Sequence, residues 1–151
     1  MQTFRKAYSV FGALLMFQFA LQLYFIAAAA LTIFGANDNA KSVYSAFKDA
    51  DTYASLHLFN AGLIFLTIVI MVGLSFGSRY PWRTTILTGV LFVLLVMQSV
   101  LAHTGVPVVA GLHGLNALIM IGLGGYLTGS NWALGRRAEA APAAPSGQVP
   151  E

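Results

Sequence analysis

Long apolar stretches alternate with short polar segments along the chain. Four stretches contain no Asp, Glu, Lys or Arg, and they cover roughly Tyr8 to Phe34, Tyr53 to Phe76, Thr85 to Ala102 and Val108 to Leu127. Each comes close to the ~20 residues that a helix needs to cross the ~30 Å hydrocarbon core of a bilayer. The pattern predicts an all-α integral membrane protein, a four-helix bundle with up-down-up-down topology.

The first stretch follows the charged segment "MQTFRK", as the apolar region of a signal peptide does. It is longer than the usual 7–15 residues of such a region, and it contains Gln18 and Gln22. We therefore expect it to be retained as a membrane helix.

The polar segment between the first two stretches, "NDNAKSVYSAFKDADTY", is the only long one between them. Helix-capping residue types occur at Asn37 to Asn39, and Val43, Tyr44 and Phe47 follow at helical spacing. This pattern predicts a short amphipathic helix at the membrane surface.

The remaining segments predict a turn and a tail. Gly105 and Pro107 in "HTGVPV" predict a tight turn between the third and fourth helices. The end of the chain is rich in Ala and Pro and lacks apolar periodicity, so residues 133–151 are predicted to be a disordered cytoplasmic tail after a transmembrane domain of residues 1–132.

Composition supports this fold class and excludes several kinds of site. The chain is 58% hydrophobic and 9% charged, whereas a soluble domain carries about 25% charged residues. It has no cysteine, which excludes disulfides, iron–sulfur clusters and covalent attachment of haem through Cys. No basic stripe suggests nucleic acid as a partner.

Basic residues predict the orientation. Six of the eight Lys and Arg residues fall on one side of the predicted bundle: Arg5, Lys6, Arg79, Arg83, Arg136 and Arg137. The positive-inside rule makes that side cytoplasmic. Both termini are then inside, and the chain is predicted to be a multi-pass protein of the bacterial cytoplasmic membrane.

Two hexapeptides, "LHLFNA" and "LHGLNA", repeat a histidine and an asparagine one helical turn apart. At 1.5 Å per residue, His57 and His113 lie roughly 33 and 35 Å from the basic residues that end their helices, while Gln22 and Gln98 lie roughly 24 and 23 Å from those that begin theirs. The matching heights predict two helix hairpins related by a pseudo-two-fold axis along the membrane normal.

The histidines predict a cofactor site. In the predicted bundle the second and fourth helices are diagonal and run in the same direction, so His57 and His113 can face each other across the core. This is the geometry of bis-histidine haem ligation. Small residues beside the histidines leave room for a flat cofactor, although they equally allow close helix packing: Ala61, Gly62, Ala110, Gly111, Gly114 and Ala117.

Two other interpretations of this histidine pair stay open. The imidazoles can serve as interhelical hydrogen-bonding groups near the interface, or they can take part in another metal site or in proton transfer. Asn60 and Asn116 are expected to be interhelical hydrogen-bond partners. Gln22 and Gln98 are expected either to pack or to donate to a ligand histidine, to the cofactor or to each other.

His103, at the end of the third helix, is more ambiguous. It is expected to be an interfacial histidine facing solvent, with contact to a haem propionate, alternative ligation or a quinol contact as the functional readings. His57, His103 and His113 together also form a candidate three-histidine Zn or Cu site, provided that their side chains converge. Aromatic residues near the helix ends are expected to be interface anchors: Tyr53, Tyr80, Trp82 and Trp132.

The segments "LHLFNAGLIFL", "LLVMQSVLAHTG" and "GLHGLNALIM" together resemble one half of a haem A synthase, over roughly residues 17–127. The chain is also similar to small four-helix membrane proteins of actinobacteria. The resemblance to haem A synthases implies that His57 and His113 are the axial pair of a b-type haem. It does not carry over the catalysis, because that family uses an acidic residue near its substrate haem and the apolar stretches of this chain have none.

The expected function is therefore a small b-type cytochrome that binds one haem b and transfers single electrons, without enzymatic activity of its own. Its partners are expected to be the lipid bilayer, with membrane quinol or a redox protein as donor or acceptor. Asp49, Asp51, Tyr44 and Phe47 offer a docking surface at the outer face. The alternatives are a cofactor-free accessory or assembly subunit and a histidine-based metal or haem carrier. The chain is expected to form a homo-oligomer or to be a subunit of a larger membrane complex.

Overall fold

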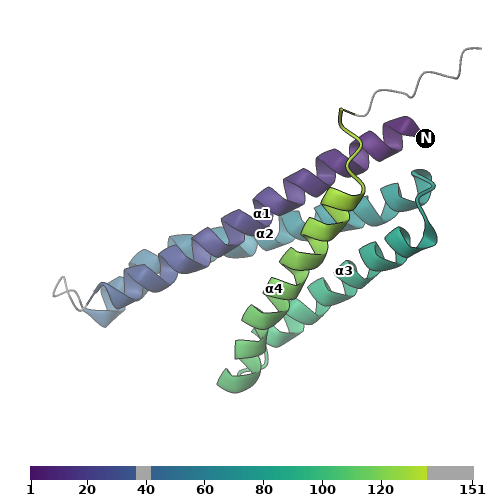
Figure 1. Cartoon of the computed structure of the whole chain (residues 1–151). Coiled ribbons are helices and arrows are strands. Elements are labelled where there is room, and N and C mark those ends of the chain that lie inside the picture. The colour runs from purple at the N-terminus through teal and green to yellow at the C-terminus, as the bar shows by residue number, and fades with distance from the viewer. Residues whose placement is uncertain (37–41, 136–151) are drawn as a thin grey trace, which may run out of the picture.

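The computed structural model describes residues 1–36 and 42–135 and contains four helices (Figure 1). Their bounds are α1 Gln2–Phe34, α2 Val43–Gly77, α3 Trp82–Ala102 and α4 Pro107–Ser130. All four are long and apolar enough to cross a membrane. The predicted all-α fold of four helices, each long and apolar enough to span a membrane, is confirmed. The predicted tail and the basic pair Arg136 and Arg137 lie outside the described residues.

The surface helix predicted between the first two spans does not exist as a separate element. Val43 to Phe47 form the first turns of α2, which continues without a break to Gly77. Ser42 caps this helix by accepting a hydrogen bond from the backbone N–H of Ser45 at 3.2 Å. No Gly or Pro stands between Val43 and His57 to interrupt the helix. The expected caps at Asn37 to Asn39 lie outside the described residues.

The turn between α3 and α4 is the tight turn that the sequence predicts. Gly105 has a φ of +66°, in the left-handed region that glycine adopts without steric cost. Pro107 occupies the first turn of α4, where its missing N–H needs no partner and its fixed φ suits a helix. These two residues end one helix and start the next within a few residues.

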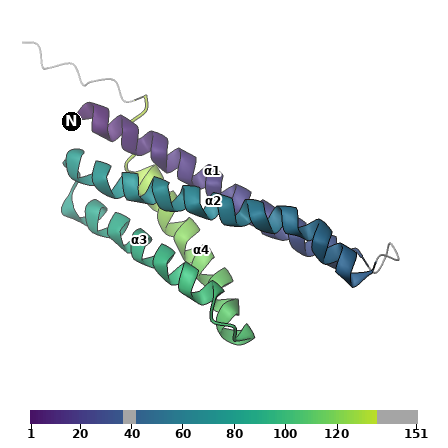
Figure 2. The same cartoon turned by 180° about the vertical axis from the view of Figure 1, so that it is seen from behind.

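The helices are arranged as two antiparallel hairpins, α1–α2 and α3–α4. Each helix packs on two neighbours, α1 on α2 and α4, and α3 on α2 and α4, which leaves α2 and α4 diagonal as predicted. The N-terminus and the end of α4 lie at one end, called here the termini end (Figure 1). At the opposite end the two hairpins diverge in both views (Figures 1 and 2), and we call this the open end.

The apolar core lies where the hairpins meet. Its fully buried members come from all four helices: Leu15, Ile68, Met71, Leu91 and Leu127. Gly12 permits the close approach of α1 and α4, because a Cβ there would stand 2.7 Å from the Thr128 hydroxyl oxygen. Burial of these apolar surfaces against each other fixes the two hairpins together near the termini.

Polar contacts close the termini end. The buried Tyr8 hydroxyl lies 2.8 Å from the Thr88 hydroxyl, and the Tyr8 ring packs edge-on against Tyr80 at 5.3 Å between centroids. Tyr80 also donates a hydrogen bond to the Asn131 carbonyl at 3.0 Å. Tyr80 is therefore part of the core packing and not the interface anchor that the sequence predicts, because its ring turns inward onto Tyr8.

Candidate functional site

The imidazole rings of His57 and His113 face each other between the two hairpins. Their centroids are 6.5 Å apart and their planes are inclined by 48°. Both residues are half-buried, and they come from the diagonal helices α2 and α4. The predicted meeting of the two histidines across the bundle is thus present in the structure.

Contacts with α1 hold His57 in place. Its Nδ1 lies 3.3 Å from the main-chain carbonyl of Gln22, and the Gln22 side-chain amide donates to the His57 carbonyl at 3.0 Å. One turn along α2, the Asn60 amide donates to the Gln22 side-chain oxygen at 2.7 Å and to the Gln18 carbonyl at 2.8 Å. We call this set of contacts the first clasp.

Three of these four contacts recur around His113 in the second hairpin. Its Nδ1 lies 3.0 Å from the main-chain carbonyl of Gln98. The Asn116 amide donates to the Gln98 side-chain oxygen at 2.6 Å and to the Leu94 carbonyl at 2.9 Å. This second clasp repeats the first one atom for atom in these three contacts. The structure therefore supports the predicted two-hairpin repeat.

The asparagines and glutamines have more definite roles than the sequence could assign. Asn60 and Asn116 are interhelical hydrogen-bond donors, as predicted. The glutamine side chains do not donate to the histidine rings. Instead, the main-chain carbonyls of Gln22 and Gln98 accept from the rings, while the side chains bond to the asparagines. The sequence could not separate the role of the main-chain carbonyl from that of the side-chain amide, because each glutamine supplies both groups.

The clasps decide which ring nitrogen is available. A carbonyl oxygen only accepts hydrogen bonds, so each ring that bonds to one carries its proton on Nδ1. A neutral imidazole then has its lone pair on Nε2. Metal-binding histidines commonly have this arrangement, in which the second ring nitrogen donates to a backbone carbonyl and fixes the ring orientation. Both histidines thus take the form that binds a metal through Nε2.

The separation of the rings fits one metal ion between them. With metal–nitrogen bonds of about 2 Å on each side, the two ring centroids of a linear bis-imidazole complex lie roughly 6 Å apart. The observed 6.5 Å is close to that value. The distance between the rings thus matches the length of a bis-imidazole arrangement around one metal ion.

Glycines beside the histidines adjoin open space. No heavy atom from elsewhere in the described chain lies within 4 Å of where a Cβ would stand at Gly62, Gly111 or Gly114. These positions are not used for close packing of helices within the chain, which was one of the two interpretations of the small residues. These exposed positions leave room on the surfaces of α2 and α4 for lipid or for a partner helix.

His103 is not brought into a three-histidine cluster. It is exposed at the end of α3, and its Nδ1 lies 2.7 Å from the carbonyl of Ser99 on its own helix. Within residues 1–36 and 42–135, no three His, Cys, Asp or Glu side chains form a group that could hold a metal ion. The three-histidine Zn or Cu site is therefore wrong, because the ring of His103 turns back onto its own backbone.

Gln18 is a buried polar residue whose role the sequence did not indicate. Its side chain is 5% exposed, and its Oε1 has no hydrogen-bond partner among the described residues. It precedes Gln22 by one turn of α1, and the corresponding position in the second hairpin is Leu94. Extending the repeat by one turn would have exposed this difference between the two halves.

A comparison of the chain with models of protein families, with curated proteins and with solved structures finds no match.

Proposed function

We propose that the protein is a membrane-embedded b-type cytochrome that binds one haem b between His57 and His113 and transfers single electrons. The observation that supports this most directly is the facing histidine pair at 6.5 Å, with each Nδ1 bonded to a carbonyl of the neighbouring helix. When bound, the haem supplies reversible one-electron chemistry at its iron.

The residues of the chain have separate tasks in this proposal. His57 and His113 bind the iron through Nε2, and the carbonyls of Gln22 and Gln98 orient the rings and hold their protons. Asn60 and Asn116 fix the glutamines against the facing helices. With both histidines bound, the iron would have no open position for a small ligand, which favours electron transfer over ligand binding.

The distribution of basic residues supports a site toward the outer membrane face. Four of the five described basic residues lie at the termini end, Arg5, Lys6, Arg79 and Arg83, and Lys48 lies at the open end. By the positive-inside rule this end faces the cytoplasm of a bacterium, and the open end with the histidine pair faces outward. An electron donor or acceptor then reaches the site from the outer leaflet or the outer aqueous phase. Membrane quinol and a redox protein at the outer face are the partner classes that fit.

Absorption spectroscopy of the protein tests this function. The chain is expressed with ample haem and purified in detergent beside a His57→Ala/His113→Ala double variant. We expect a sharp Soret band and low-spin α and β bands on reduction for the natural chain, and neither for the double variant. A colourless natural chain, or an unchanged spectrum in the double variant, contradicts the proposal.

A cofactor-free accessory subunit is the second candidate, favoured by the open space beside Gly62, Gly111 and Gly114. Helices of a partner or of a second copy can fill this space, as small residues at membrane interfaces allow. In this case the purified protein is colourless and elutes with a partner or as an oligomer. Metal analysis of colourless protein distinguishes it from a metal carrier.

A further inference from the structure

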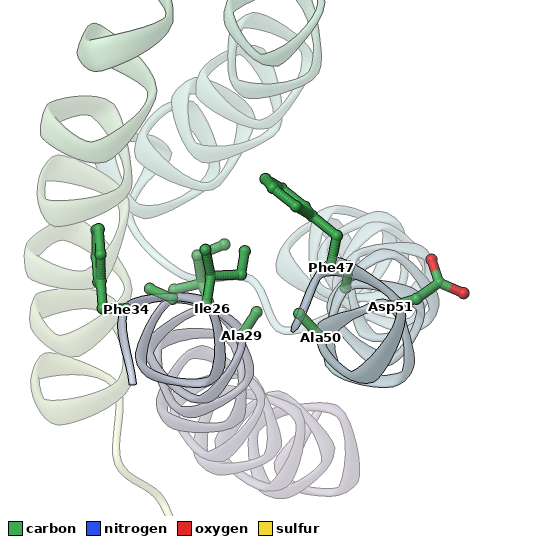
Figure 3. A pocket seen from close by; sticks show the side chains of 9 residues that line it. Ile26, Ala29, Phe34, Phe47, Ala50 and Asp51 are labelled. Carbon is green, nitrogen blue, oxygen red and sulfur yellow. The ribbon is translucent and has the colours of Figure 1, made fainter. Parts of the chain in front are cut away.

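Two hollows at opposite ends of the molecule differ in their lining. The groove between α1 and α2 at the open end has apolar walls, and the Asp51 carboxylate points away from it (Figure 3). A hollow of about 140 Å³ at the termini end, called here the termini hollow, lies between the start of α1, the turn before α3 and the end of α4. Polar side chains and aromatic rings line it: Gln2, Arg5, Tyr80, Ser130, Asn131 and Trp132.

The two ends of the molecule also differ in charge. The start of α1 and the turn after α2 bring Arg5, Lys6 and Arg79 to the termini end, whereas the acidic residues of the described chain, Asp49 and Asp51, both lie in α2 toward the open end. No carboxylate of residues 1–36 and 42–135 therefore lies near these basic side chains to neutralise them. The termini end attracts anions and repels cations.

Three contacts hold Arg5 in place at the termini hollow. Its Nε donates to the Ser78 carbonyl at 3.1 Å, its Nη2 donates to the Arg79 carbonyl at 3.4 Å, and the guanidinium carbon lies 5.1 Å from the centroid of the Tyr80 ring. These bonds cover the carbonyl end of α2, which would otherwise oppose an anion. The carbonyls carry no net charge, so Arg5 keeps its positive charge, and its Nη1 bonds to no acceptor among the described residues.

Other donors of the lining are also unused. Within the part of the chain that the structure describes, the side-chain N–H or O–H groups of three lining residues bond to no acceptor: Gln2, Ser130 and Trp132. The Asn131 carbonyl, by contrast, already accepts from the hydroxyls of Ser9 and Tyr80 at 3.1 and 3.0 Å. The matching ligand is a group that carries negative charge and accepts several hydrogen bonds, as a phosphate does.

The position of the hollow favours a phospholipid as the source of this phosphate. Each of the four helices begins or ends at the termini end, and Trp132 has the amphipathic ring that is typical of the membrane–water interface. Phospholipid headgroups lie at this depth, and basic pockets between membrane helices bind anionic ones. The volume of about 140 Å³ is below that of sites for drug-sized ligands, so the hollow suits one phosphate group.

We propose that the termini hollow binds the phosphate of an anionic phospholipid, with Arg5 as the charged donor and Gln2, Ser130 and Trp132 as neutral donors. The bound lipid touches both α1 and the segment that follows α4, so it bridges the two hairpins at the end where they pack together. A zwitterionic choline lipid binds more weakly, because the basic residues repel its cation. This binding is independent of any cofactor between the histidines, which lie toward the other end.

Native mass spectrometry of the full chain in detergent tests the site, with phosphatidylglycerol, phosphatidylcholine and inorganic phosphate titrated separately. Arg5→Gln removes the charged donor, and Lys6→Gln removes the same charge from the next residue, which does not line the hollow. Because Arg5 also bonds to the end of α2, a second pair leaves its contacts intact. Gln2→Glu adds a carboxylate to the lining, and Thr3→Glu adds one at the next residue, outside the lining.

We expect the natural chain to bind phosphatidylglycerol at least about tenfold more tightly than phosphatidylcholine, since each basic residue near a headgroup contributes to the attraction. Arg5→Gln weakens the binding of phosphatidylglycerol about tenfold, because it removes a hydrogen bond to a charged group. Gln2→Glu weakens it about fivefold through repulsion between like charges. Lys6→Gln and Thr3→Glu weaken it by no more than about twofold, because solvent and salt screen charges outside the hollow.

Equal affinity for phosphatidylglycerol and phosphatidylcholine overturns the proposal. Equal losses in each variant and its control also overturn it, because they indicate diffuse attraction to the basic end of the molecule. Inorganic phosphate that binds as tightly as phosphatidylglycerol assigns the hollow to a free anion and not to a lipid.

Discussion

The two hairpins hold their histidines in the same way although their helices differ in length and sequence. In α1–α2 the ring of His57 bonds to the Gln22 carbonyl, and in α3–α4 the ring of His113 bonds to the Gln98 carbonyl. Asparagines one turn further along fix the same glutamines. The comparison teaches that a clasp needs only two neighbouring helices, and that the site arises when two such hairpins pack side by side.

The hairpins differ in what surrounds each clasp. The first hairpin has the buried amide of Gln18 where the second has Leu94. It also continues much further toward the open end, from Val43 to His57, where the second has only Pro107 to His113. The clasps are therefore alike, while the first hairpin extends much further beyond its clasp than the second.

The largest expected effect is the loss of the low-spin haem spectrum in single histidine variants, which tests whether the two hairpins are equivalent. His57→Ala and His113→Ala should each abolish the low-spin spectrum, because each removes one of the two equivalent Nε2 ligands. His103→Ala should leave the spectrum intact, since its ring bonds to its own helix. Absorption and electron paramagnetic resonance spectra of the purified variants measure this. A low-spin spectrum that survives in either clasp variant breaks the equivalence.

Exchanging the residues that distinguish the hairpins should have the next largest effect. Leu94→Gln should lower the free energy of unfolding by roughly 1–3 kcal/mol, because it places an amide where the packing is apolar. Gln18→Leu should raise it by up to about 1 kcal/mol, because it removes a buried oxygen that has no partner among the described residues. Denaturant unfolding in detergent, followed by circular dichroism, measures both. A loss of stability in Gln18→Leu would show instead that the buried amide contributes favourably to the fold.

Removing the asparagines should cost less and affect both hairpins equally. Asn60→Ala and Asn116→Ala should each lower the free energy of unfolding by about 1 kcal/mol, since interhelical hydrogen bonds in membranes are modest. Leu58→Ala, at a side chain that is 71% exposed, is the control for truncation on α2. The same unfolding measurement applies. Unequal losses at the two asparagines would mean that the clasps differ in strength despite their matched contacts.

The smallest expected effect is the destabilisation of a helix's first turn when its N-cap side chain is removed. Ser42→Ala removes the side-chain cap of α2 and should destabilise its first turn by about 0.5–1 kcal/mol. The start of α4 has no side-chain cap to lose, because its N-cap residue is Val106, whose side chain cannot accept a hydrogen bond. Hydrogen exchange should rise over the first turn of α2 and stay unchanged at His57. An increase that reaches His57 would show that the end of the first hairpin is coupled to its clasp.

Much of this fold follows from local sequence, and the errors have local causes. The apolar stretches predict the four spans because a bilayer demands helices of this length. The prediction of a separate surface helix before α2 was wrong. The polar residues around Asp51 were interpreted as a loop, although none of them breaks a helix. Tyr80 was read as an interface anchor because aromatic residues at helix ends usually are. Its inward ring depends on Tyr8, which is distant in sequence.

The candidate site also has features that the sequence predicted and features that it did not. The pair His57 and Asn60 recurs as His113 and Asn116 at a matched height. From the sequence alone, this repetition predicted that the two histidines contact one shared ligand. Helical periodicity suffices for that inference. The roles of the Gln22 and Gln98 carbonyls did not follow, because a backbone group has no residue type to reveal it.

By itself, the sequence determined the number of spans, their alternating direction and the common level of the two histidines, since these depend on hydrophobic length and on a fixed rise per residue. Only the tertiary structure decided that the rings stand 6.5 Å apart, that their Nδ1 atoms are engaged, that the side-chain oxygen of Gln18 is buried without a partner among the described residues, and that the hairpins part at the open end. These features depend on how four helices rotate and cross, which packing between residues distant in the chain determines.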